Sequence, residues 1–204
     1  MRISEKRFER DLRRYELAQR MIAHEARRGT IVHWTGLSRH RVALLLKEFD
    51  RPDKNRYRGP PPCTAAFFCK SLAHESESAA FAYVALRMNV IESPAEPPAL
   101  GLAALARAER LVNAFELYRE VVPQTRLSLE HAMLLVAELS TQELLFLDTC
   151  DQCEGLWVRE RVGRPQERCP FCRANGLRMA VPGPWIAGEE SGVHQSSDRH
   201  ASSP

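Results

Sequence analysis

Two pairs of cysteines constrain the fold of this chain more than any other feature of its sequence. Cys150 and Cys153 form the first Cys-x2-Cys pair, Cys169 and Cys172 form the second, and 15 residues lie between the pairs. Two intervening residues let both thiolates of a pair face one metal ion, and two pairs complete a closed tetrahedral shell of sulfur. The spacing therefore predicts one structural Zn2+ ion, which stabilises a segment too small to build its own core.

Two other uses of paired cysteines fit less well. A thioredoxin-like redox site has a single pair at the start of a helix in a βαβ unit, and the surrounding residues do not resemble one. An iron–sulfur cluster stays open as an alternative, although its usual spacings differ. Cys63 and Cys69 lack the spacing of metal ligands, and we expect them to be free thiols.

The overall composition is that of a globular chain. Of the 204 residues, 44% are hydrophobic and 27% are charged, which permits a sizeable core. No apolar run reaches the roughly 18–20 residues of a membrane span, and the charged N-terminus does not resemble a signal peptide. We therefore expect a cytoplasmic protein.

Charge is distributed unevenly along the chain. Residues 1–60 hold 16 basic and 8 acidic residues, for a net charge of +8, whereas residues 61–149 hold 6 and 11, for a net charge of −5. A basic first third is typical of a protein that binds a polyanion. A solvated helix face accounts for the charge alone equally well.

The basic third also predicts helices. A first helix should carry an apolar stripe and stop at Gly29; the stripe comprises Phe8, Leu12, Tyr15, Ile22 and Ala26. A short helix over residues 30–35 should follow, then a turn at Gly36, then a helix over residues 39–49 with Ser38 as its N-cap. The inward face of this last helix is expected to comprise Val42, Leu45, Leu46 and Phe49.

The turn and the capped helix resemble the second half of a DNA-reading helix-turn-helix. In such a motif the second helix enters the major groove, where arginine pairs with guanine and basic side chains hold phosphates. The candidate DNA-binding residues are Arg39, His40, Arg41, Lys47, Lys54, Arg56 and Arg58. The alternative is an ordinary helical hairpin without a DNA-binding role.

The rest of the chain divides at changes in composition. Proline-rich residues 50–62 predict a linker, helices are expected over residues 64–92, 99–121 and 128–139, and short strands should flank the first cysteine pair. The predicted fold is mainly α: a basic helix-turn-helix-like segment (1–60), a helical bundle (61–140), a small zinc-binding region built on the four cysteines (141–180) and a disordered tail (181–204).

Taken in this order, the segments resemble the FlhC family, whose members are subunits of the bacterial flagellar master regulator FlhDC. The matching segments are LSRHRVALLLKE followed by GPPP, FELYREVVP, and the four-cysteine spacing, and the similarity spans about residues 15–175. The resemblance implies a mainly helical fold with zinc at the four cysteines. It also implies a hetero-oligomer with an FlhD-like subunit that binds promoter DNA and recruits RNA polymerase to flagellar operons.

The sequence thus predicts a transcriptional activator subunit, with a zinc-stabilised protein-interaction adaptor that does not bind DNA as the alternative. We do not expect an enzyme, because no GxSxG, HExxH or GxxxxGK[ST] motif occurs and the predicted metal shell is closed. Glu130 and His131 share one predicted helix, where we expect surface residues rather than an acid–base pair.

Overall fold

The computed structural model of the protein describes residues 5–49, 62–91, 102–163 and 167–176. Within these residues the fold is mainly α, as predicted, with seven α-helices, one short 3-10 helix and one two-stranded hairpin. The predicted tail (181–204) and the linker residues Lys54, Arg56 and Arg58 lie outside the described residues. None of the helices in the described part is long and apolar enough to cross a membrane.

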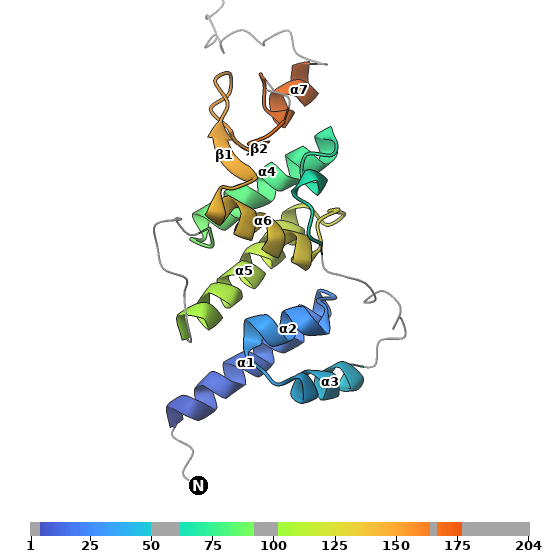
Figure 1. Ribbon diagram of the computed structural model, residues 1–204, viewed down its shortest axis with the longest axis vertical. Helices are drawn as coiled ribbons and strands as arrows, with labels where there is room; N and C mark the ends of the chain where they lie inside the picture. Colours follow the sequence, from blue (N-terminus) through green and yellow to red (C-terminus); the bar gives the residue numbers. More distant parts are fainter. Residues whose placement is uncertain (1–4, 50–61, 92–101, 164–166, 177–204) are drawn as a thin grey trace, which may run out of the picture.

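The first three helices form one unit at one end of the molecule (Figure 1). They are α1 (Glu5–Ala23), α2 (Arg28–Thr35) and α3 (Arg39–Glu48). Helix α1 ends six residues before the predicted stop at Gly29, because Glu25 adopts a left-handed conformation with φ of 63° and the Ala26 N–H bonds back to the Met21 carbonyl. Glycine is the usual left-handed residue at the end of a helix. Because Glu25 takes this position here, the sequence did not indicate where α1 ends.

Burial follows the predicted apolar stripes only in part. Ile22 and Ala26 of the first stripe are buried in the core. Phe8 and Leu12 are 63% and 47% exposed, and Phe49, expected on the inward face of α3, is 40% exposed. Periodicity identifies the apolar face of a helix, but it does not show how far along the helix the neighbouring elements reach.

The central bundle consists of the 3-10 helix η1 (Ala65–Phe67), α4 (Leu72–Arg87), α5 (Leu102–Val121) and α6 (Leu129–Thr141). Ser128 is the N-cap of α6, as predicted, and its hydroxyl accepts the His131 N–H. The rings of Phe81, Phe115 and Tyr118 meet edge-on in the core between α4 and α5.

The C-terminal elements lie at the opposite end of the molecule from α1–α3 (Figure 1). Strands β1 (Leu145–Thr149) and β2 (Leu156–Glu160) pair antiparallel, with Leu147 opposite Val158, and the short helix α7 (Pro170–Gly176) follows. Both β2 and α7 pack against α4. The first cysteine pair therefore lies at the hairpin turn, and the second pair lies next to it at the start of α7.

Candidate metal centre and helix-turn-helix surface

The four cysteines of the predicted site come together in space. Their sulfur atoms all lie within 4.8 Å of one another, so the group could hold a metal ion. Cys150 Sγ lies 3.9 Å from Cys172 Sγ, and Cys153 Sγ lies 3.6 Å from Cys169 Sγ. An ion bound tetrahedrally by four sulfurs at about 2.3 Å requires sulfur–sulfur separations of about 3.8 Å. The cluster therefore matches the size of a four-sulfur metal shell.

The backbone supports the cluster at both cysteine pairs. The Cys172 N–H points at Cys169 Sγ over 3.3 Å, and the Cys150 N–H bonds to the Gly155 carbonyl over 3.0 Å. The left-handed residue of the first turn is Glu154, with φ of 56°. A Cβ at the next residue, Gly155, would lie 3.3 Å from Cys153 Sγ, which is a tight contact, so the glycine leaves room for that sulfur.

Electrostatics within the cluster favour a cation. Backbone N–H groups, with that of Cys169 contributing most, lower the pKa of the Cys150 thiol to about 6. The thiol of Cys153, burial and the other thiols raise the pKa of Cys172 to about 12. Four thiolates this close repel one another, so the cluster can carry all four charges only when a metal ion compensates them.

The metal centre is anchored on helix α4. Cys150 and Cys169 are buried against Ala79 and Trp157 in a small cluster separate from the main core. Arg173, directly after the last cysteine, forms an ion pair with Glu75, whose side chain is 6% exposed. The four cysteines are therefore attached to the bundle by this small apolar cluster and one buried ion pair, while the hairpin that carries the first pair reaches the main core through Leu145 and Val158.

Cys63 and Cys69 are free thiols, as predicted. Cys63 is exposed, whereas burial raises the pKa of the half-buried Cys69 thiol to about 12. Neither belongs to the four-cysteine group.

The turn between α2 and α3 lies at the predicted position, and Ser38 caps α3 as predicted. Gly36 adopts a left-handed φ of 67° and donates its N–H to the Val32 carbonyl, which ends α2. The Ser38 hydroxyl accepts the Arg41 N–H and begins α3. A Cβ at Gly36 would lie 3.5 Å from the Arg14 guanidinium, so α1 packs directly against this turn. Ile31, Val42 and Leu45 hold the two helices together from inside.

The candidate DNA-binding residues in the described part share the exposed surface of α3. Arg39, His40, Arg41 and Lys47 are exposed. Arg39, Arg41 and Lys47 form no ion pair with a carboxylate of the described residues. The Arg41 guanidinium lies 6.0 Å from the centre of the Tyr15 ring on α1.

Helix α1 is also basic, but several of its cations face the bundle. Arg13 pairs with Glu109 of α5, and Arg20 pairs with Glu116 over 2.5 Å. His24, just after the helix, also contacts Glu116 through its Nε2, over 2.9 Å. Part of the positive charge of the first third is therefore neutralised within the fold, whereas Arg39, Arg41 and Lys47 of α3 have no carboxylate partner among the described residues.

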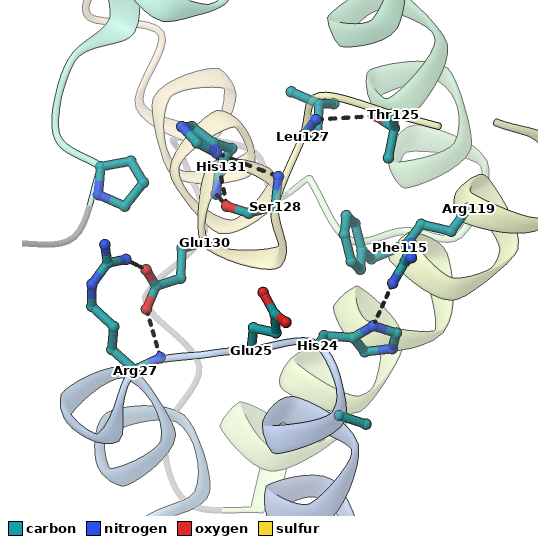
Figure 2. Close-up of a pocket in the computed structure, with 12 residues that line it drawn as sticks. His24, Glu25, Arg27, Phe115, Arg119, Thr125, Leu127, Ser128, Glu130 and His131 are labelled. Atoms are coloured by element: carbon teal, nitrogen blue, oxygen red, sulfur yellow. Dashed lines mark hydrogen bonds and ion pairs between the residues drawn. The ribbon is translucent and has the colours of Figure 1, made fainter. Parts of the chain in front are cut away.

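Glu130 joins the N-terminal unit to the bundle, as Figure 2 shows. Its Oε1 accepts the Arg27 N–H over 2.9 Å and the Thr30 hydroxyl over 2.7 Å, and its carboxylate pairs with the Arg27 guanidinium. Helix α2 has no side-chain cap of its own, so Glu130 caps it from α6. The expectation that Glu130 lies on the surface was wrong, since it is 6% exposed.

His131, the neighbour of Glu130, is half-buried rather than a surface residue. Its ring stacks on Phe67 with 3.9 Å between centroids, and its Nδ1 lies 2.7 Å from the Ser128 hydroxyl. Both residues line a cavity of about 610 Å3 between the N-terminal unit and the bundle. The polar groups that the figure labels there largely bond to one another, as the Arg119–His24 and Arg27–Glu130 contacts illustrate (Figure 2).

Comparison with known proteins adds no further constraint: no family model matches the chain, and no curated protein sequence matches it.

Proposed function

We propose that this protein is a DNA-binding subunit of a transcriptional activator, related to the FlhC family. In this proposal it assembles with an FlhD-like subunit, binds promoters of flagellar and other operons, and promotes transcription by RNA polymerase. The observation that carries the proposal is the surface of α3, where exposed cations without carboxylate partners among the described residues follow a left-handed glycine turn.

The geometry of that surface agrees with readout in the major groove. Helix-turn-helix proteins contact base edges with the first residues of their second helix, and Arg39, His40 and Arg41 occupy the first turn of α3. Arginine pairs with guanine in two hydrogen bonds, and Lys47 in the last turn suits a phosphate. Arg39 and Arg41 are therefore proposed for base contacts.

The proposed metal is a single structural Zn2+ ion at Cys150, Cys153, Cys169 and Cys172. Zinc is the usual occupant of closed tetrahedral four-thiolate sites, and the sulfur separations suit its bond length. Elemental analysis of the protein purified without added metal should give one zinc per chain. Iron in place of zinc, or no stoichiometric metal, would overturn this part of the proposal.

The DNA-binding test compares two variants of α3 with a matched control. The complex isolated from the native host, or rebuilt with the variant chain, is titrated with labelled flagellar promoter fragments at several salt concentrations. Arg39→Ala and Arg41→Ala should each weaken specific binding by about 5- to 150-fold, corresponding to about 1–3 kcal/mol. Arg87→Ala removes an equal charge from an exposed position on α4 and should leave binding unchanged.

Two outcomes would overturn the DNA-binding proposal. If neither α3 variant weakens binding more than Arg87→Ala does, α3 is not the recognition helix. If the native complex holds protein partners but no DNA, and its function is insensitive to salt, the adaptor hypothesis is favoured, because phosphate-driven binding weakens steeply with salt.

A further inference from the structure

An apolar groove lies where the metal centre meets the helical bundle. Its volume is about 470 Å3, and its walls come from α4, the end of α5, the turn between the first cysteine pair and β2, and α7. Three large apolar side chains line it while staying exposed to solvent: Tyr83 (53%), Val121 (75%) and Phe171 (40%). When several large apolar side chains are exposed next to one another, they mark a surface that another segment covers.

The charge that lines the groove is negative. Glu154, beside the first cysteine pair, is the charged residue among those that line it. Helix α5 ends at Val121, so its carboxyl end adds a partial negative charge at the same groove. The groove therefore suits a segment that combines several apolar side chains with one cation.

The residues that follow α7 have this composition. Leu177, Arg178 and Met179 come directly after Gly176, and Val181, Trp185 and Ile186 follow within a few positions. Helix α7 itself contributes Phe171 to the groove, so the chain continues from an element that already lines it. Ten residues span up to about 33–36 Å, and a tethered segment acts at a high effective concentration.

We propose that residues 177–186 of this chain occupy the groove, with apolar side chains against Tyr83, Val121 and Phe171 and with Arg178 toward Glu154. In this proposal the disordered tail that the sequence predicts from residue 181 would begin after residue 186. This docking does not depend on DNA binding. It does depend on the metal centre, because Glu154, Gly155 and Phe171 build one wall of the groove. Removal of the metal should therefore release the segment.

Photo-crosslinking in the full-length, metal-loaded protein tests the contact directly. The crosslinker p-benzoylphenylalanine replaces Val121, whose exposure leaves room for it, and in a control protein it replaces Val162, which is 85% exposed and does not line the groove. After irradiation, mass spectrometry should find intramolecular links from position 121 to residues 177–186, at least tenfold above those from position 162. Chelation of the metal should reduce them.

Amide hydrogen exchange tests the same contact if the crosslinker does not react. Val121→Glu places a charge in the groove that Glu154 also lines, whereas Val162→Glu makes the same change elsewhere. Amide hydrogen exchange over residues 177–186 should accelerate in Val121→Glu and stay at the wild-type rate in Val162→Glu. Equal exchange in all three proteins would overturn the proposal. So would links from position 121 to a second copy of the chain or to another protein.

Discussion

The two ends of the molecule attach to the central bundle in the same way but differ in what holds each end together. Glu130 of α6 pairs with Arg27 of the N-terminal unit, and Glu75 of α4 pairs with Arg173 of the metal centre; both carboxylates are buried. The N-terminal unit shares the main apolar core, and so does the C-terminal hairpin through Leu145 and Val158, whereas the four cysteines pack only in a small cluster around Trp157. Similar buried ion pairs therefore join the two ends to the bundle, but the two ends should respond very differently to loss of the metal or of an ion pair.

Loss of the metal should have the largest effect, and it should be confined to one end. Cys169→Ser removes a buried sulfur from the four-cysteine cluster, and structural zinc, the ion proposed there, contributes roughly 10–16 kcal/mol of binding energy in small zinc-dependent domains. We expect residues 150–155 and 167–176, which surround the cysteines, to lose amide protection while α1–α3 keep theirs, as measured by hydrogen exchange. Cys63→Ser, which changes an exposed free thiol, is the control. Equal loss of protection in α1–α3 would show that the two ends are not independent.

Removal of the buried anchors should have the next largest effect. Glu130→Ala leaves the Arg27 guanidinium and the start of α2 without their shared acceptor, which should lower the free energy of unfolding by about 2–4 kcal/mol. Glu75→Ala should cost less in the metal-loaded protein, because the four cysteines still hold α7 in place. Urea unfolding of both variants measures the difference, with Glu120→Ala at an exposed position as the control.

If Glu75→Ala proved the more damaging of the two, the metal centre would depend on its ion pair more than on its ligands. That outcome would reverse the comparison between the two ends.

Acid should weaken the junction of the N-terminal unit with the bundle. Burial, Arg27 and His74 lower the pKa of His131 below its ordinary 6.5, so its contribution to stability is complete above pH 6.5 and is lost as pH falls through the lowered value. Burial alone would raise the pKa of Glu116, but hydrogen bonds from Arg20 and His24 lower it below 4.5. Its contribution is therefore lost only at more acidic pH.

The histidine part of this pH dependence can be isolated by substitution. Between pH 7 and 5.5 the urea midpoint of the wild type should fall, and the fall should be smaller in His131→Asn. His33→Asn, at an exposed position, should behave like the wild type. A His131→Asn midpoint that falls as steeply as that of the wild type would contradict the assignment.

The sequence predicted the parts of the fold that depend on neighbouring residues. The four cysteines, the Ser38 cap and the Ser128 cap are local signals, and the structure agrees with all three. The buried position of Glu130 could not be predicted, because Arg27 lies 103 positions away and an acidic residue in the first turn of a helix is ordinarily exposed. Long-range pairing also decided which arginines of the basic third remain available.

The smallest expected effects distinguish the arginines of α3, which have no carboxylate partner in the described part of the chain, from Arg20 of α1, which is ion-paired. Arg39→Ala should change the free energy of unfolding by less than about 0.5 kcal/mol, because its side chain has no carboxylate partner in the described part of the chain. Arg41→Ala should cost up to about 1 kcal/mol, because its guanidinium lies over the Tyr15 ring. Arg20→Ala breaks contacts with Glu116 and Asn113 and should cost about 1 kcal/mol. Thermal or urea unfolding of the three variants resolves this difference. A stability cost at Arg39 comparable to that at Arg20 would mean that α3 uses its cations to hold the fold, which would remove the main reason for assigning them to DNA.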